Sequence, residues 1–158
     1  MPSERVINVR PATVSDVPLL LGLVSQYWSF EGISGFDDTR VANQLGRLLS
    51  TPSLGAGWIA DADGTAVGYL LAVYVFSLEH LGLTAEIDEL FVSPVQRAQG
   101  VGAQLLRAAE AEFARRGCTN AALQLSRTNL AAREFYRRHA YRDRSGYELL
   151  DKNLPVPG

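Results

Sequence analysis

The sequence has one cysteine, one lysine and no long apolar run. A single cysteine, Cys118, excludes an internal disulfide and a cysteine-based metal cluster. No apolar run approaches the roughly 20 residues of a membrane span, and residues 1–10 contain no apolar core of a signal peptide. We therefore expect a cytoplasmic protein that uses neither a metal nor a membrane.

An excess of charge of one sign is also missing. The 15 basic and 17 acidic residues give a formal net charge of −2 at pH 7. Without a basic field, nucleic acid is not an expected partner. The 158 residues, of which 47% are hydrophobic, suit a single globular domain, 1–158, that buries its own core.

Strand-like and helix-like patterns alternate along the first half of the chain. A short strand at 6–9 precedes a helix that Ser15 or Asp16 caps, and a second helix capped by Asp37 or Asp38 runs to Leu49. The dipeptide at 63–64, Asp-Gly between two apolar runs, predicts a hairpin, because such turns need positive φ angles.

The second half continues the pattern. It predicts a strand at 86–92, a helix at 102–116 that Gly117 ends, a strand at 120–126 and a helix opened by Asn129. A weak terminal hairpin is expected through Tyr141 and residues 147–150. The chain thus reads as an α/β (α+β) protein, a mixed sheet with helices on both faces.

A glycine-containing loop, SPVQRAQGVGAQLL at 93–106, joins the strand at 86–92 to the next helix. Gly100 and Gly102 let the backbone turn sharply, and the N–H groups of 98–103 then point outward at a helix N-terminus, where phosphate binds well. Arg97 adds a positive charge. A plain strand-to-helix turn accounts for the loop equally well. The loop is neither a Walker loop, because no Gly-Lys-Ser/Thr follows, nor a Rossmann fingerprint, because Leu105 replaces the third glycine.

The order of motifs in the whole chain decides between these readings. DELFVSPVQRAQGVGAQLL, followed by NLAAREFYRRHAY, resembles the GNAT superfamily of acetyl-CoA-dependent N-acetyltransferases. The family signature Arg/Gln-x-x-Gly-x-Gly/Ala is matched by Arg97, Gly100 and Gly102, and its later segment by Asn129, Ala132, Phe135 and Tyr136. One departure is Ala140, which stands where the family often has glycine, and it puts the local turn in doubt.

The resemblance implies a mostly antiparallel sheet of six or seven strands, splayed between the fourth and fifth strands to hold acetyl-CoA. It implies that the backbone of three strand residues pairs with the pantetheine arm, that the loop amides hold the pyrophosphate beside Arg97, and that Asn129 and Ala132 contact the cofactor from the other side. The strand residues are Leu90, Phe91 and Val92, and the loop residues are Ala98, Gln99, Gly100, Val101, Gly102 and Ala103.

Acetyl transfer to an amine also needs an acid and a base. The resemblance makes Tyr136 the general acid, and the alternative is an aromatic packed beside Phe135. For the base, Asp88 and Glu89 in AEIDEL rank together and Glu86 ranks behind, the alternative being a solvated strand end. Regular alternation places Asp88 and Glu89 on opposite faces, and a bulge would shift that parity.

The acceptor pocket is expected between the first two helices, their loop and the hairpin strands. Aromatic rings with carboxylates suit a cationic amine, although the same residues also fit a core and a solvated loop. The residues selected for acceptor binding are Tyr27, Glu31, Tyr74 and Glu79, from a region that also offers Trp28, Phe30, Phe36, Asp37, Phe76 and His80.

The sequence thus predicts an enzyme that moves acetyl from acetyl-CoA to a primary amine on a small molecule. Transfer is expected directly within a ternary complex, because Cys118 is poorly placed to form an acyl-enzyme. The alternatives are a protein lysine or N-terminal acetyltransferase, a non-catalytic acyl-CoA-binding regulatory module and, less well supported, a nucleotide-binding protein. The oligomeric state stays open, a homodimer included.

Overall fold

The computed structural model describes residues 5–97 and 99–156, which form two compact units within Met1–Gln124 and Leu125–Gly158. The first unit contains the sheet and three α-helices, and the second contains α4 (Leu130–Arg138). Each unit is described by itself below. The expectation of a single domain stays a prediction. No helix of the described residues is both long and apolar enough to cross a bilayer.

The sheet of the first unit has five strands in the order β1–β2–β3–β4–β5. The strands β1 (Ile7–Pro11), β2 (Gly55–Ala62), β3 (Thr65–Ser77) and β4 (Gly82–Val92) are antiparallel, and β5 (Ala121–Leu123) runs parallel to β4. The predicted fold class, a mixed and mostly antiparallel sheet with helices on both faces, is confirmed. The expected six or seven strands are five within the described residues.

The difference in strand number lies in the C-terminal segment. The described residues after Arg138 form no strand, and Tyr147, Leu149 and Leu150 are exposed. The predicted terminal hairpin is therefore wrong. Residues 142–146 are polar or glycine, so the apolar alternation is too short to specify a buried face.

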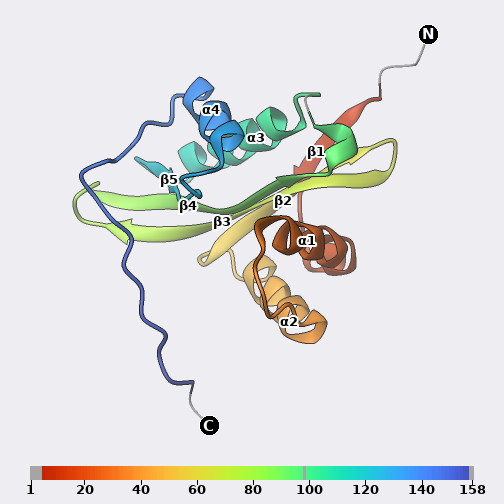
Figure 1. The fold of residues 1–158 in the computed structure, drawn as a ribbon, viewed down its shortest axis with the longest axis horizontal. Coiled ribbons are helices and arrows are strands. Elements are labelled where there is room, and N and C mark those ends of the chain that lie inside the picture. Colours follow the sequence, from red (N-terminus) through yellow and green to blue (C-terminus); the bar gives the residue numbers. More distant parts are fainter. Residues whose placement is uncertain (1–4, 98, 157–158) are drawn as a thin grey trace. The chain divides into compact units, whose positions relative to one another are not determined.

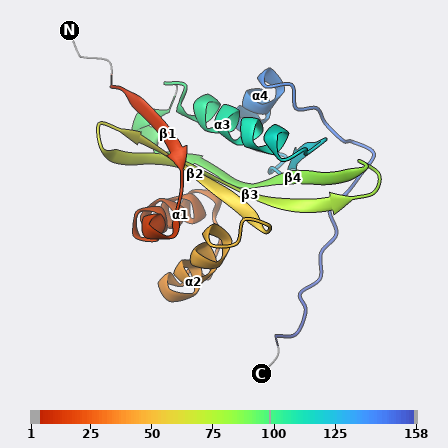
Figure 2. The same ribbon diagram turned by 180° about the vertical axis from the view of Figure 1, so that it is seen from behind.

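Helices cover both faces of the sheet in the first unit (Figures 1 and 2). Helices α1 (Val17–Glu31) and α2 (Asp38–Leu49) lie on one face, and α3 (Val101–Arg115) lies on the other. The core under α1 and α2 consists of Leu20, Leu23, Val24, Leu45, Ile59, Tyr69, Leu71 and Phe91. On the other face α3 buries Leu105, Leu106, Ala109 and Phe113, the stripe that the sequence predicts.

The caps and turns follow the local sequence. Asp37 caps α2 by accepting a 2.9 Å hydrogen bond from the Arg40 amide, and Asp63 and Gly64 make the β2–β3 turn with φ angles of 51° and 85°. Asp16 precedes α1, but its carboxylate does not cap that helix. It accepts hydrogen bonds of 2.8 Å from the Arg10 side chain and from the Thr13 amide. These bonds, above all the one from Arg10, lower the pKa of Asp16 to about 2.

Candidate active site

A β-bulge interrupts the pairing of β4 with β3 at the acidic stretch of the sequence. Leu71 pairs with Glu89 and Ala72 pairs with Ile87, so Asp88 is the extra residue. A bulge changes the face to which nearby side chains point. As a result, Asp88 and Glu89 both line one pocket, whereas regular alternation would have separated them. Glu86, the third acid of the stretch, lies outside that lining and accepts a long 3.5 Å bond from Gln124.

Two hydrogen bonds hold the carboxylate of Glu89. Its Oε1 accepts a 2.8 Å bond from the hydroxyl of Tyr69, and its Oε2 accepts a 3.1 Å bond from the indole N–H of Trp28. Burial raises the pKa of Glu89, and the two hydrogen bonds oppose that shift. Burial, together with the nearby Glu89, also raises the pKa of Tyr69, so this tyrosine remains a hydrogen-bond donor at neutral pH.

Asp88 differs from Glu89 in its exposure and in its hydrogen bonds. It is the more exposed of the two, and no side chain among the described residues donates a hydrogen bond to it. Partial removal of water from its carboxylate nevertheless raises its pKa. The site therefore contains one carboxylate that is oriented by its neighbours and one that is accessible from the pocket.

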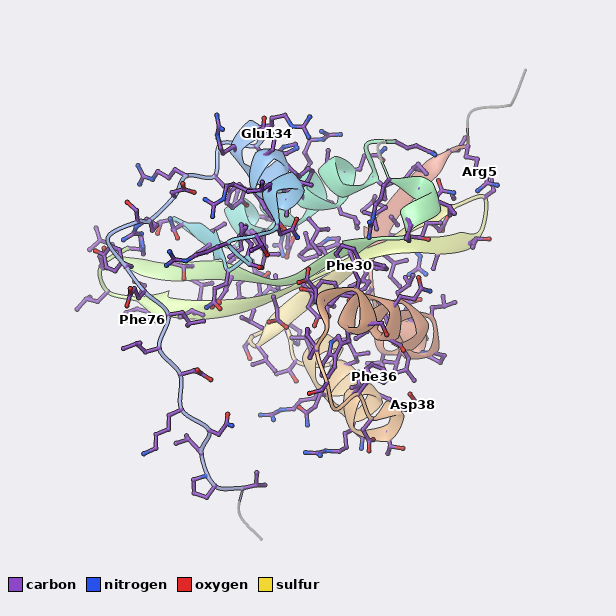
Figure 3. All side chains as sticks on the ribbon, viewed as in Figure 1. Arg5, Phe30, Phe36, Asp38, Phe76 and Glu134 are labelled. Atoms are coloured by element: carbon purple, nitrogen blue, oxygen red, sulfur yellow. The ribbon has the colours of Figure 1, made fainter. Side chains whose placement is uncertain are left out.

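The pocket itself lies between α1, α2, their connecting loop and strands β3 and β4. Its volume is about 420 Å³. Trp28 and Phe36 pack edge to face at 5.5 Å beside it, and Phe36 lies near the start of α2 (Figure 3). The lining residues are Val24, Trp28, Ser34, Gly35, Asp37, Arg40, Val41, Gln44, Leu45, Leu48, Leu71, Asp88 and Glu89.

The four residues selected from the sequence for acceptor binding lie outside this lining. Tyr27 packs its ring against Phe91 at 6.0 Å, and burial beside Glu89 raises its pKa to about 12. Glu31 ends α1 and is exposed. Tyr74 packs against Phe113 of α3, on the opposite face of the sheet, and Glu79 lies in the turn between β3 and β4.

Trp28 and Asp37, which come from the same predicted region, do line the pocket. Ser34, Arg40 and Gln44 also line the pocket and were not predicted from the sequence. Arg40 and Gln44 had a usable signal, because each precedes a residue of the apolar α2 stripe, at Val41 and Leu45, and so borders the buried face. The hydrogen bonds of Trp28 and Tyr69 to Glu89 had no signal in the sequence, because they join residues that only the fold brings together.

Strand β4 presents backbone groups beyond its short pairing with β5. That pairing involves Ala85, Glu86 and Ile87, and β4 continues to Val92. The Ser93 amide donates to Val67 of β3, whereas the Val92 carbonyl accepts a 3.2 Å bond from Arg97 Nε. Because alternate residues of an antiparallel strand face the same side, the backbone groups of Leu90 and Val92 point away from β3. They can pair with an extended ligand.

The glycine loop leads directly into α3. Gly100 is the N-cap residue with a φ of 77°, no side chain caps the helix, and Val101 is buried. The first amides of a helix have no partner within it, so those of 101–103 are available to an anion. Arg97 stacks on Phe30 at 4.6 Å, and Gln99 is exposed. Ala98 lies outside the described residues. Loop and strand edge together fit a phosphate-bearing, amide-containing arm.

The second unit contains the late family segment. Asn129 caps α4, its Oδ1 accepting a 3.1 Å bond from the Ala132 amide. The Tyr136 ring lies 5.1 Å from Phe135 and 5.5 Å from Tyr141. The roles of Asn129, Ala132 and Tyr136 stay predictions.

Comparison with known proteins gives consistent results. The acetyltransferase (GNAT) family model matches residues 22–141. The N-acetyltransferase YhfO of Bacillus subtilis (strain 168) is 27% identical over 95% of this chain and 99% of its own. The aminoglycoside N(6')-acetyltransferase type 1 of Klebsiella aerogenes is 32% identical over 78% of this chain and 82% of its own.

A solved structure extends the likeness to the fold. An integron cassette protein from the mobile metagenome of Cole Harbour Salt Marsh superposes with a TM-score of 0.83 and 28% identity, over 94% of this chain and 91% of that one. The chain therefore belongs to the acetyltransferase (GNAT) family, which confirms the predicted enzyme class, an acetyl-CoA-dependent N-acetyltransferase.

Proposed function

We propose that the protein transfers the acetyl group of acetyl-CoA directly to a primary amine on a small molecule, in a complex that holds both substrates. The observation that best supports this is the pair of carboxylates at the β4 bulge. Asp88 and Glu89 line the 420 Å³ pocket and directly precede Leu90, where the outward-facing backbone of β4 begins. An amine in the pocket would thus lie next to an extended donor on the strand edge.

The first task of the site is to deprotonate the amine. A lysine-like amine has a pKa near 10.4, so its neutral form costs roughly 4–5 kcal/mol at pH 7. A carboxylate whose pKa is raised accepts a proton more readily, and a well-placed base contributes about 10²–10⁴-fold. Asp88 and Glu89 both have raised pKa values. Either acts as the base, Asp88 through its access to the pocket or Glu89 through its fixed orientation.

The second task is to hold the acetyl donor. Backbone groups of Leu90 and Val92 would bind the pantetheine arm, and amides of 99–103 with Arg97 would bind the pyrophosphate. The backbone groups of Phe91, the third residue expected to bind the arm, face Tyr69 of β3 instead. When bound, acetyl-CoA supplies a thioester whose carbonyl the amine attacks. The departing thiolate then needs a proton, and Tyr136 is the proposed donor. Ala98, Asn129 and Ala132 are the other residues proposed to contact acetyl-CoA.

The acceptor proposed here is a small molecule. The pocket volume of about 420 Å³ supports this, as does the likeness to an enzyme named for acetylating aminoglycosides. Direct transfer is supported by Cys118, because burial raises the pKa of its thiol and a neutral thiol is a poor nucleophile. A cytoplasmic location is also proposed, because a chain with one cysteine forms no internal disulfide.

The experiment is a calorimetric titration with acetyl-CoA, with ATP and NAD as controls, followed by assays of thiol release with a panel of primary amines. We expect one-site binding of acetyl-CoA alone and amine-dependent release of CoA. Binding without turnover of any amine or lysine peptide would instead identify a non-catalytic acyl-CoA-binding module. Turnover of peptides alone would identify a protein acetyltransferase.

A further inference from the structure

The acceptor pocket contains one cationic side chain among its described lining residues, that of Arg40 on α2. The other charged residues of the lining are Asp37, the N-cap residue of α2, and Asp88 and Glu89 on β4. The acids of β4 already suffice to attract an amine. Arg40 therefore requires a separate explanation, because a cation beside an amine site would weaken binding of a simple amine.

Arg40 has no evident structural task. Its guanidinium forms no ion pair with the described residues, although its backbone amide donates to Asp37. It also occupies the first turn of α2, which begins at Asp38. A helix N-terminus carries partial positive charge, so a cation there costs about 0.3–1 kcal/mol. Arg40 is exposed and borders the pocket, so its charge is accessible to a ligand there.

The neighbours of Arg40 in the pocket can assist in binding an anion. Gln44 follows Arg40 by four residues, which places both side chains on one face of α2. The Gln44 amide and the Ser34 hydroxyl are hydrogen-bond donors that also belong to the lining. An arginine fork with such donors beside it matches the planar or tetrahedral oxygens of a carboxylate or phosphonate.

We infer that the acceptor is a primary amine that also carries an anionic group, a carboxylate, phosphonate or phosphate. The amine would lie toward Asp88 and Glu89, and the anionic group would pair with Arg40. This inference rests on the proposed function, because it assigns the amine to the same pocket. A second ammonium group on the acceptor would instead face Arg40 as well as Asp37.

The test compares three acceptors of one length that differ in the group at the far end. They are 1-propylamine, 1,3-diaminopropane and 3-aminopropylphosphonate. We expect the phosphonate to have a kcat/KM at least about tenfold above the other two, because charge-assisted arginine bonds are strong. Equal values for all three acceptors, or a preference for the diamine, would overturn the inference and leave the proposed function intact.

Arg40→Gln removes the charge, and Arg47→Gln is the matched control, because Arg47 lies on α2 outside the pocket lining. Arg40→Gln should lower kcat/KM for the phosphonate by at least about tenfold, mainly through KM, and should not lower it for propylamine, whose binding the charge of Arg40 opposes. Arg47→Gln should change neither. An equal loss for both amines in Arg40→Gln would contradict a role specific to the anion.

A binding measurement separates this inference from the proposed function. Calorimetry with 3-aminopropylphosphonate, in the presence of CoA, requires no turnover. Binding to the wild type that Arg40→Gln abolishes supports the inference even if no amine is acetylated. Failure of the phosphonate to bind the wild type would overturn it, whatever the outcome of the thiol-release assay.

Discussion

Tyr69 on β3 donates a 2.8 Å hydrogen bond to Oε1 of Glu89 on β4, next to the bulge that exposes Asp88. This bond joins the fully buried centre of the sheet to the wall of the pocket. It fixes the direction of the carboxylate, and it opposes the rise in the pKa of Glu89 that burial causes. The core of the fold therefore adjusts the chemistry of the site.

Tyr69→Phe tests that adjustment. Without the phenolic donor, the pKa of Glu89 rises further, because a bond that favours the charged form is lost. If Glu89 is the base, the acidic limb of the kcat/KM profile moves to higher pH. The measurement is thiol release across pH, with the exposed Tyr147→Phe as control. An unmoved limb would assign the base to Asp88 instead.

Gly100→Ala tests the donor loop. Gly100 has a φ of 77°, which costs an alanine about 1–2 kcal/mol, so the variant should lose that much stability or distort the loop. We expect weaker binding of acetyl-CoA by calorimetry and a thermal midpoint lower by a few degrees. Gly22→Ala, in the middle of α1 with open space around it, should instead raise the midpoint. Equal acetyl-CoA affinity in both variants would contradict the proposal that the glycine loop binds the pyrophosphate.

Ala140→Gly tests the turn at which this chain departs from the family pattern. Ala140 has a φ of 69°, and the amides of Ala140 and Tyr141 donate to Arg137 and Tyr136 in a Schellman arrangement. The turn is thus kept without glycine. Glycine should relieve the strain and raise the unfolding free energy by up to about 1 kcal/mol, after its own entropic cost. Urea denaturation measures this, and a loss of stability would contradict it.

Tyr136→Phe tests the proposed general acid. Loss of the phenolic proton should lower kcat by at least about tenfold, because protonation of the departing thiolate is then left to water. The ring packing against Phe135 and Tyr141 is retained in this variant, so acetyl-CoA affinity should not change. The readouts are kcat and a calorimetric Kd. Unchanged turnover would leave Tyr136 with a packing role alone.

Much of the fold was predictable because local chemistry specifies it. Asp37 as a cap, Asp63-Gly64 as a hairpin turn and Gly117 after α3 each act through their own backbone neighbourhood. The glycine loop was found through its spacing. These features need no knowledge of which strands pair.

The arrangement of the site was less predictable because it depends on pairing. The bulge at Asp88 exists only in the register of β4 against β3, so the sequence alone left the parity of Asp88 and Glu89 open. The partners of Glu89 come from residues 61 and 20 positions away. Tyr74 was selected for its chemistry, and strand alternation then placed it on the face that α3 covers.

The most direct test of the account is the pH dependence of kcat/KM for Asp88→Asn and Glu89→Gln, with Glu86→Gln on the same strand as control. We expect one of the first two variants to lose the acidic limb and at least about 10²-fold in kcat/KM, and the control to keep both. If Asp88→Asn and Glu89→Gln both retain the limb and the rate, the carboxylates at the bulge do not deprotonate the amine, and the proposed mechanism is wrong.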